Sequence, residues 1–227
     1  MPSYMMLYNT LLAVSAGIGL LGAATLFRKL RKGTTVYAEG WSLLFGMTGF
    51  ILTILGLAVT VTWPYHVAGT LDANILFGEP SIGFGVVLLA EAFYFWHERA
   101  ALHLEKLQRM LKPVSLYVFG LGLVMTACAT SWIRYRLGAA PPVEPLSGRF
   151  SGHPVIESTF LGVLYGLVAL GALLFPFALH KRSVKIGQLI YLCWIIAGVV
   201  LLLFGALNYY THIGDLQNTT VGTHYKY

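Results

Sequence analysis

The chain has 227 residues, of which 57% are hydrophobic and only 11% are charged. A soluble domain carries about 25% charged residues, so this composition excludes a water-soluble globule and indicates an integral membrane protein. The net charge of +6 does not indicate nucleic-acid binding, because the Lys and Arg residues cluster at the ends of apolar segments, where they set membrane topology.

Six apolar segments are each long enough to cross about 30 Å of hydrocarbon, which takes about 20 helical residues. The first segment is followed, and not preceded, by its basic run, so it is not expected to be a cleaved signal peptide. We therefore expect an all-α fold, in which residues 1–227 form one polytopic bundle of about six transmembrane helices in the cell membrane, with the lipid bilayer around it. The expected spans are about 5–27, 41–62, 77–96, 114–132, 160–179 and 186–210.

Basic residues follow the first, third and fifth segments, in 27–33, 97–112 and 180–185. The positive-inside rule places these three connections in the cytoplasm and both termini outside it. The 134–157 connection, which this topology places outside, is an exception to the rule because it contains three arginines. Short connections predict that consecutive helices are antiparallel neighbours. Leu107, Met110 and Leu111 recur among charges, so we expect the third helix to continue through 97–112 as an amphipathic helix.

Glu91 is the most informative single residue, because an acid inside a membrane span is costly unless it is paired, protonated or near water. It lies roughly 9 Å inside the end of the third span, counting 1.5 Å per residue. Two interpretations stay open. Glu91 is either a functional carboxyl, such as a proton relay or a polar partner inside the bundle, or a structural one that meets a hydroxyl such as Tyr191.

Histidines at both faces suggest two possible cofactor sites. His97 and His180 lie at the inner ends of the third and fifth segments, where a pair could hold a haem between helices, near Glu91. His66, His153 and His212 lie at the outer face with several carboxylates, a donor set that suits a transition metal. Interfacial histidines without a cofactor are the alternative for both groups.

Two motifs flank the second connection: "TVTWPYH" at 60–66 and "NILFGEP" at 74–80. They contain Trp63, Asn74 and Glu79, and Glu79 beside Pro80 is typical of a helix start. We also expect Glu79 to tie the outer loops together through an arginine such as Arg134 or Arg136, or through a nearby histidine.

The two motifs resemble an uncharacterised prokaryotic family, domain of unknown function 981. The resemblance implies a multi-pass membrane protein of archaea or bacteria. It brings no reaction, cofactor or catalytic residue.

Three functions remain open. The first is a binding or accessory protein, a subunit of a larger membrane complex or a homo-oligomer. The second is a redox component that holds haem or a metal through its histidines. The third is a small oligomeric transporter or channel, which the thin polar inventory of the spans disfavours. Besides hydroxyls, that inventory includes Glu91, Gln188 and Asn208.

Overall fold

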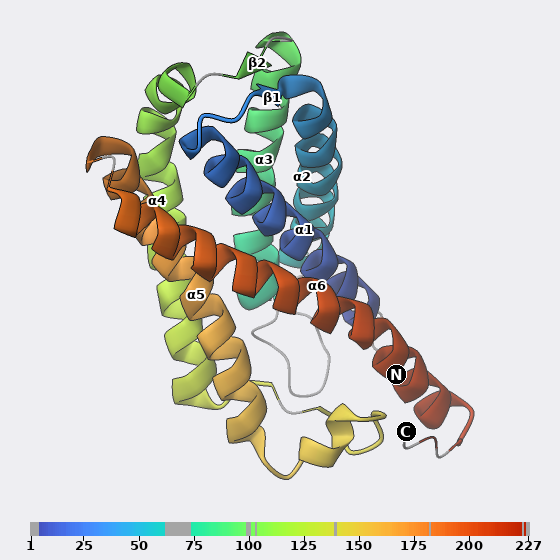
Figure 1. Cartoon of the computed structure of the whole chain (residues 1–227). Coiled ribbons are helices and arrows are strands. Elements are labelled where there is room, and N and C mark those ends of the chain that lie inside the picture. Colours follow the sequence, from blue (N-terminus) through green and yellow to red (C-terminus); the bar gives the residue numbers. More distant parts are fainter. Residues whose placement is uncertain are drawn as a thin grey trace.

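Six long helices make up most of the part of the chain that the structure describes (Figure 1). A computed structural model describes residues 5–61, 74–98, 101–102, 104–138, 140–181, 183–223 and 225. All six helices are long and apolar enough to cross a membrane, α3 together with the turn before it. The predicted all-α bundle of six spans is therefore confirmed. The helices are α1 (Met5–Arg31), α2 (Ala38–Val61), α3 (Glu79–Glu98), α4 (Leu104–Tyr135), α5 (Pro154–Lys181) and α6 (Val184–Thr220).

The helices extend beyond the apolar spans, because a helix can continue into the headgroup region or into water. The 37 residues of α6 cover about 55 Å at 1.5 Å per residue, against about 30 Å of hydrocarbon. The prediction that the third helix continues through 97–112 is wrong. α3 ends at Glu98, and the amphipathic residues form the first turns of α4, which begins at Leu104. Lys106 still joins the two helices, through an ion pair with Glu98.

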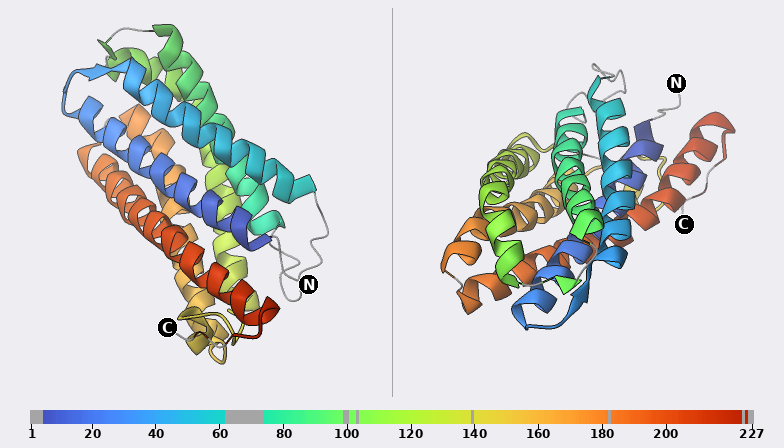
Figure 2. Two further views of the ribbon diagram at one scale, coloured as in Figure 1. Left: turned by 90° about the vertical axis from the view of Figure 1, so that its right-hand side faces the viewer. Right: turned by 90° about the horizontal axis from the view of Figure 1, so that it is seen from above.

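The bundle has two chemically different ends. The basic end carries the connections α1–α2, α3–α4 and α5–α6, and the terminal end carries both described chain ends and the α4–α5 connection (Figures 1 and 2). At the basic end, β1 (Val36–Tyr37) pairs antiparallel with β2 (Ala101–Leu102). This short ribbon ties the α1–α2 connection to the α3–α4 connection.

The six helices pack most closely as three pairs: α1 with α6, α2 with α3, and α4 with α5. Glycine lets the backbones of each pair approach. A Cβ at Gly49 of α2 would lie 2.8 Å from the Gly85 carbonyl of α3, and one at Gly17 of α1 would lie 2.7 Å from the Gly198 carbonyl of α6. A Cβ at Gly162 of α5 would lie 3.0 Å from the Ala129 carbonyl of α4. Small residues are the usual means of close helix packing in lipid.

The prediction that consecutive helices are neighbours is correct for α1–α2, α2–α3, α4–α5 and α5–α6, and α3–α4 is the exception. The first helix pairs with the last, while α3 and α4, although consecutive, make few backbone contacts with each other. The α1–α6 pair is fastened at the basic end, where Arg28 Nη1 donates to the Tyr191 hydroxyl at 2.6 Å and Arg31 Nη2 donates to the Ser183 carbonyl at 2.9 Å. The three pairs leave space among them.

Candidate functional site

A cavity of about 580 Å³ lies among the helix pairs. Residues of α1, α3, α4, α5, α6 and the α4–α5 connection line it. Along α1 the lining runs from Asn9 to Leu30, which is about 31 Å at 1.5 Å per residue. The cavity is therefore elongated, and its length matches the hydrocarbon thickness of a bilayer, about 30 Å.

The middle of the cavity is apolar. Trp194 of α6 forms part of its wall, and the indole N–H donates to the Val168 carbonyl of α5 at 3.3 Å. Gly171 admits the indole, because a Cβ there would lie only 2.0 Å from Trp194 Nε1. The other residues of this wall include Leu20, Phe84, Leu121, Leu164, Phe175 and Leu201.

Glu91 lies on the wall of the cavity toward the basic end, one turn before Phe95. Leu107 and Leu111, from the amphipathic start of α4, line the same region and are buried. Tyr191, the structural partner that the sequence suggested, instead accepts a hydrogen bond from Arg28. Among the described residues, no hydrogen bond or ion pair involves the Glu91 carboxyl.

Aromatic rings surround the cavity toward the terminal end. Trp132 of α4 packs against Phe77, with ring centroids 5.7 Å apart, and edge-on against Tyr165 at 6.1 Å. The Tyr165 hydroxyl donates to the Leu76 carbonyl at 2.7 Å, which links α5 to the start of α3. Trp132 is only 3% exposed. Its indole N–H is near the Tyr165 hydroxyl but makes no well-formed hydrogen bond with any described residue.

Polar side chains of α1 and α6 line the cavity beyond these rings. Asn208 follows Phe204 by one helical turn, and Phe204 packs against the Trp132 cluster. Asn208 is 6% exposed, and no described residue hydrogen-bonds its amide. His212, one further turn along α6, has its Nδ1 3.0 Å from Thr10 Oγ1 and its Nε2 3.7 Å from a carboxylate oxygen of Glu144.

The α4–α5 connection closes the terminal end over these groups. Arg136, Gly138 and Leu146 have positive φ angles of 54°, 76° and 64°, so the chain turns sharply where it leaves α4 and again before α5.

Glu157 of α5 accepts a hydrogen bond from the Ala140 amide at 2.9 Å, and Ser158 donates to the Leu137 carbonyl at 2.6 Å. These bonds hold the connection against the first turns of α5.

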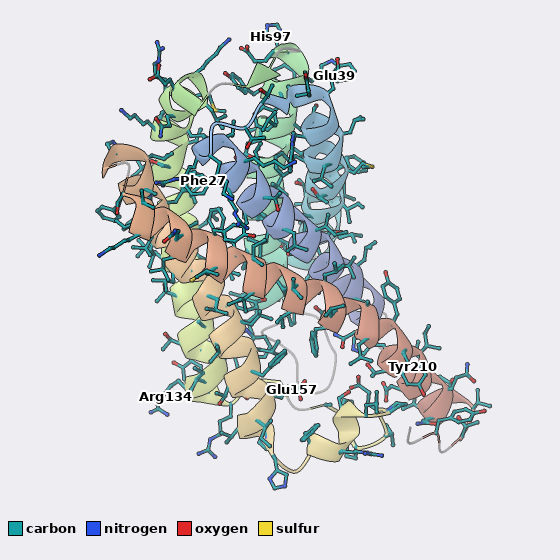
Figure 3. The ribbon with its side chains drawn as sticks, in the orientation of Figure 1. Phe27, Glu39, His97, Arg134, Glu157 and Tyr210 are labelled. Carbon is teal, nitrogen blue, oxygen red and sulfur yellow. The ribbon has the colours of Figure 1, made fainter. Side chains whose placement is uncertain are left out.

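The predicted haem histidines do not line the cavity. His97 and His180 are both exposed, and Figure 3 places His97 at the basic end, beside Glu39. His180 Nδ1 lies 2.8 Å from the Pro176 carbonyl, so this nitrogen is the donor and Nε2 is left free. The haem site stays a prediction, which visible absorbance of the purified protein tests.

The structure describes two of the three histidines of the predicted outer metal site, and it places them apart. His66 lies outside the described residues, His153 is exposed just before α5, and His212 lines the cavity. Among the described residues there is no group of three or more His, Cys, Asp or Glu side chains placed to hold a metal ion. A metal site with His66 stays a prediction.

The "NILFGEP" motif packs the start of α3 against the end of α2. A π-helical turn, Asn74–Gly78, runs directly into α3. Asn74 is buried, and its amide donates to the Val59 carbonyl near the end of α2. A Cβ at Gly78 would lie 2.4 Å from Thr60 Oγ1. These two residues of the motif therefore have a packing role.

His66 lies outside the described residues, and no arginine among them forms the predicted clasp with Glu79. Its side chain is exposed, and no ion pair among the described residues joins it to Arg134, Arg136 or Arg149. Because the π-helical turn precedes Glu79, the free amides of the helix start lie several residues before it. Arg134 points away from the bundle in Figure 3, whereas Arg136 is one of the residues that line the cavity. Trp63 lies outside the described residues.

Sequence reasoning identified Glu91, Arg136 and His212, which all line the cavity, but it did not single out Trp132. It missed Asn9, Glu144 and Tyr165 as cavity residues. One available signal was the presence of an amide, Asn9 and Asn208, in each of two otherwise apolar helices, since intramembrane polar groups mark sites.

A family model described as "Protein of unknown function (DUF981)" matches residues 1–215. No curated protein matches the chain, and no solved structure does.

Proposed function

Because the chain belongs to the DUF981 family of proteins of unknown function, its role is argued from its own residues, and we propose that it is a membrane-embedded binding protein. Its ligand is an elongated lipid, held lengthwise among the helix pairs. The observation that carries this proposal is the cavity of about 580 Å³ that follows α1 from Asn9 to Leu30. This volume lies within the range of about 300–1,000 Å³ that is usual for ligand sites.

The shape of the cavity supports a long ligand over a compact one. Lining residues recur along α1 for about 31 Å, and along α6 from Trp194 to His212 for about 27 Å. A chain molecule fills such a space, whereas a compact ligand leaves most of its wall without contacts. Five helices share the wall, so a bound chain would also bridge the three helix pairs.

The chemistry of the wall supports a hydrocarbon chain over a path for water or ions. Leu, Phe, Val and Ala side chains form the middle of the cavity, and an apolar cavity of this kind holds apolar ligands and not ordered water. A channel or ion transporter needs a continuous polar path. Between Glu91 and the polar groups at the terminal end, the described wall offers only Ser81, the Tyr165 hydroxyl and the Trp194 indole N–H, and the last two already donate to carbonyls.

The experiment that tests this proposal is native mass spectrometry of protein purified in mild detergent, with lipid analysis of the same sample. We expect copurified lipid near one molecule per chain. Ala16→Phe and Ala172→Phe each place a ring in the cavity, and each is expected to lower lipid occupancy several-fold, because the ring takes the space of the chain. Both residues line the cavity.

The matched control is Gly166→Phe. Gly166 lies on the same helix as Ala172, and a Cβ at this position meets no atom within 4 Å. The control is expected to keep the bound lipid. Lipid-free wild-type protein that is folded and does not take up lipid from vesicles would overturn the proposal. Equal loss of lipid in the control would show that the cavity is not the binding site.

A lipid-holding bundle is compatible with an accessory role in a larger complex. The described helices expose apolar stripes, such as Leu43, Met47, Phe50, Ile54 and Leu57 of α2, which suit either lipid or a protein subunit. Cross-linking in intact membranes, followed by mass spectrometry, is the measurement that separates a monomer, a homo-oligomer and a mixed complex.

A further inference from the structure

The terminal end of the cavity has polar groups with free hydrogen-bonding capacity. Trp132 and Asn208 are both more than nine-tenths buried, both line the cavity, and neither side chain has a well-formed hydrogen bond with a described residue. Burying such groups unpaired costs about 1–3 kcal/mol each. A ligand atom that pairs with them recovers that cost, so the two side chains together point to a ligand.

The two groups belong to one region of the cavity. Phe204 packs against the cluster that contains Trp132. It also packs against Phe160, with ring centroids 5.3 Å apart and the rings tilted by 58°. Asn208 follows Phe204 by one turn and therefore lies on the same face of α6. Asn9 of α1 lines the same end and adds a second amide.

The charges around this end disfavour an anionic headgroup. Among the described lining residues, Arg136 is the only Lys or Arg, while Glu144 and Glu157 both lie on the wall. A carboxylate or phosphate bound here would lie near two acidic side chains, Glu144 and Glu157, and only one basic side chain, Arg136, so repulsion would outweigh attraction. An indole N–H is a donor only, so its partner must be an acceptor.

A cationic headgroup is also a poor fit. Glu144 already faces the His212 ring, and Glu157 already accepts from the Ala140 amide. The free groups that remain are the Arg136 guanidinium, the indole N–H of Trp132 and the amides of Asn9 and Asn208. The guanidinium and the indole N–H can only donate hydrogen bonds. An uncharged oxygen satisfies these groups without placing a new charge in a buried site.

We propose that the terminal end of the cavity binds an uncharged, oxygen-bearing headgroup, a hydroxyl or a carbonyl, of a long-chain lipid. The indole N–H of Trp132 donates to the headgroup oxygen, and the Asn208 amide, which can donate and accept, forms a second hydrogen bond. This inference rests on the proposed lipid-binding function and names the ligand class of the same site.

The test uses delipidated full-length protein and four probes with the same C18 chain: an alcohol, a methyl ketone, a carboxylic acid and an amine. Binding is measured by native mass spectrometry and by the shift in melting temperature. We expect the alcohol and the ketone to bind more tightly than the acid and the amine. The difference between alcohol and ketone tells whether the site prefers a hydroxyl or a carbonyl.

Two variants remove the polar groups: Asn208→Leu keeps the shape of the side chain, and Trp132→Phe keeps an aromatic ring of smaller volume. Trp132→Phe and Asn208→Leu are each expected to weaken alcohol and ketone binding about 2- to 12-fold, the equivalent of one neutral hydrogen bond. Asn208→Leu is also expected to raise the melting temperature of the lipid-free protein, because the unpaired amide is gone. If the Asn208 amide had only a structural role, Asn208→Leu would lower the melting temperature of the lipid-free protein as well as the affinity for the probes.

The outcomes separate the two proposals. Equal binding of all four probes, unchanged by the two variants, overturns the headgroup inference and leaves lipid binding standing. Tightest binding of the acid or the amine overturns the headgroup inference as well. Failure of every probe to bind wild-type protein, together with no copurified lipid, overturns the lipid-binding function itself.

Discussion

At the scale of single residues, the polar side chains inside the bundle divide into satisfied and unsatisfied groups. Ser42 donates to the Ala92 carbonyl at 2.8 Å and Tyr165 donates to the Leu76 carbonyl at 2.7 Å. Glu91, Trp132 and Asn208 line the cavity with polar atoms that no described residue fully satisfies. Satisfied groups fasten helices, while unsatisfied groups lower stability and are retained where a ligand or a proton needs them.

Glu91→Leu tests this division. Placing an acid in the centre of a membrane costs about 2.5–3.5 kcal/mol, so at the depth of Glu91 we expect the leucine to stabilise lipid-free protein by about 1–3 kcal/mol. The measurement is thermal unfolding in mild detergent. Glu91→Gln is the matched control, because it keeps a polar group of the same shape and is expected to change stability less. A leucine variant that melts below the glutamine variant would show that Glu91 has a stabilising partner.

At the scale of helices, the positions of the spans could be predicted from sequence, and their partners could not. A run of about 20 apolar residues is a direct consequence of bilayer thickness, and each predicted span lies largely within one observed helix. Most of the observed helices extend beyond the predicted spans, because a helix does not stop where the hydrocarbon stops. Pairing depends on glycines such as Gly17 and Gly49, and sequence alone does not tell which glycine faces which helix.

The α2–α3 pair makes a sharp test of the glycine contacts. In Gly49→Ala the added methyl group would lie 2.8 Å from the Gly85 carbonyl and 2.9 Å from the Leu89 amide nitrogen, both backbone atoms. We expect a loss of stability of about 1–3 kcal/mol, the usual cost of overpacking. Gly46→Ala is the control on the same helix, since its nearest neighbour would be the Ala92 Cβ at 3.8 Å. Equal melting temperatures for the two variants would contradict the observed packing.

At the scale of the whole molecule, the cavity could not have been predicted. Side chains that face lipid and side chains that line an apolar cavity have the same chemistry, so the hydropathy pattern does not separate them. Phe50 is exposed on α2, and Phe175 lines the cavity from α5, yet both read as ordinary span residues. Glu91 could be found from sequence because it is chemically out of place in an apolar span, and His212 because it is one of several histidines expected at the outer face.

The orientation of the molecule remains a prediction, with the basic end in the cytoplasm and the terminal end outside. Gly40 at the basic end and Gly152 at the terminal end are both exposed, with no atom within 4 Å of an added Cβ. They form a matched pair for cysteine substitution, because the native cysteines Cys128 and Cys193 are buried. A membrane-impermeant maleimide is expected to label Gly152→Cys in intact cells, and Gly40→Cys only after the membrane is permeabilised. The reverse pattern would invert the topology.

The pairing of the first helix with the last has a consequence for synthesis. The pairs α2–α3 and α4–α5 are complete as soon as their second helix leaves the ribosome, but nearly 190 residues separate the end of α1 from the end of α6. At about 5–20 residues per second this interval is on the order of 10–40 s. Throughout it, the face of α1 that carries Thr10 and Gly17, which packs against α6 in the finished protein, has no native partner. The nascent chain therefore depends on lipid, on its own later helices or on the insertion machinery to shelter that face.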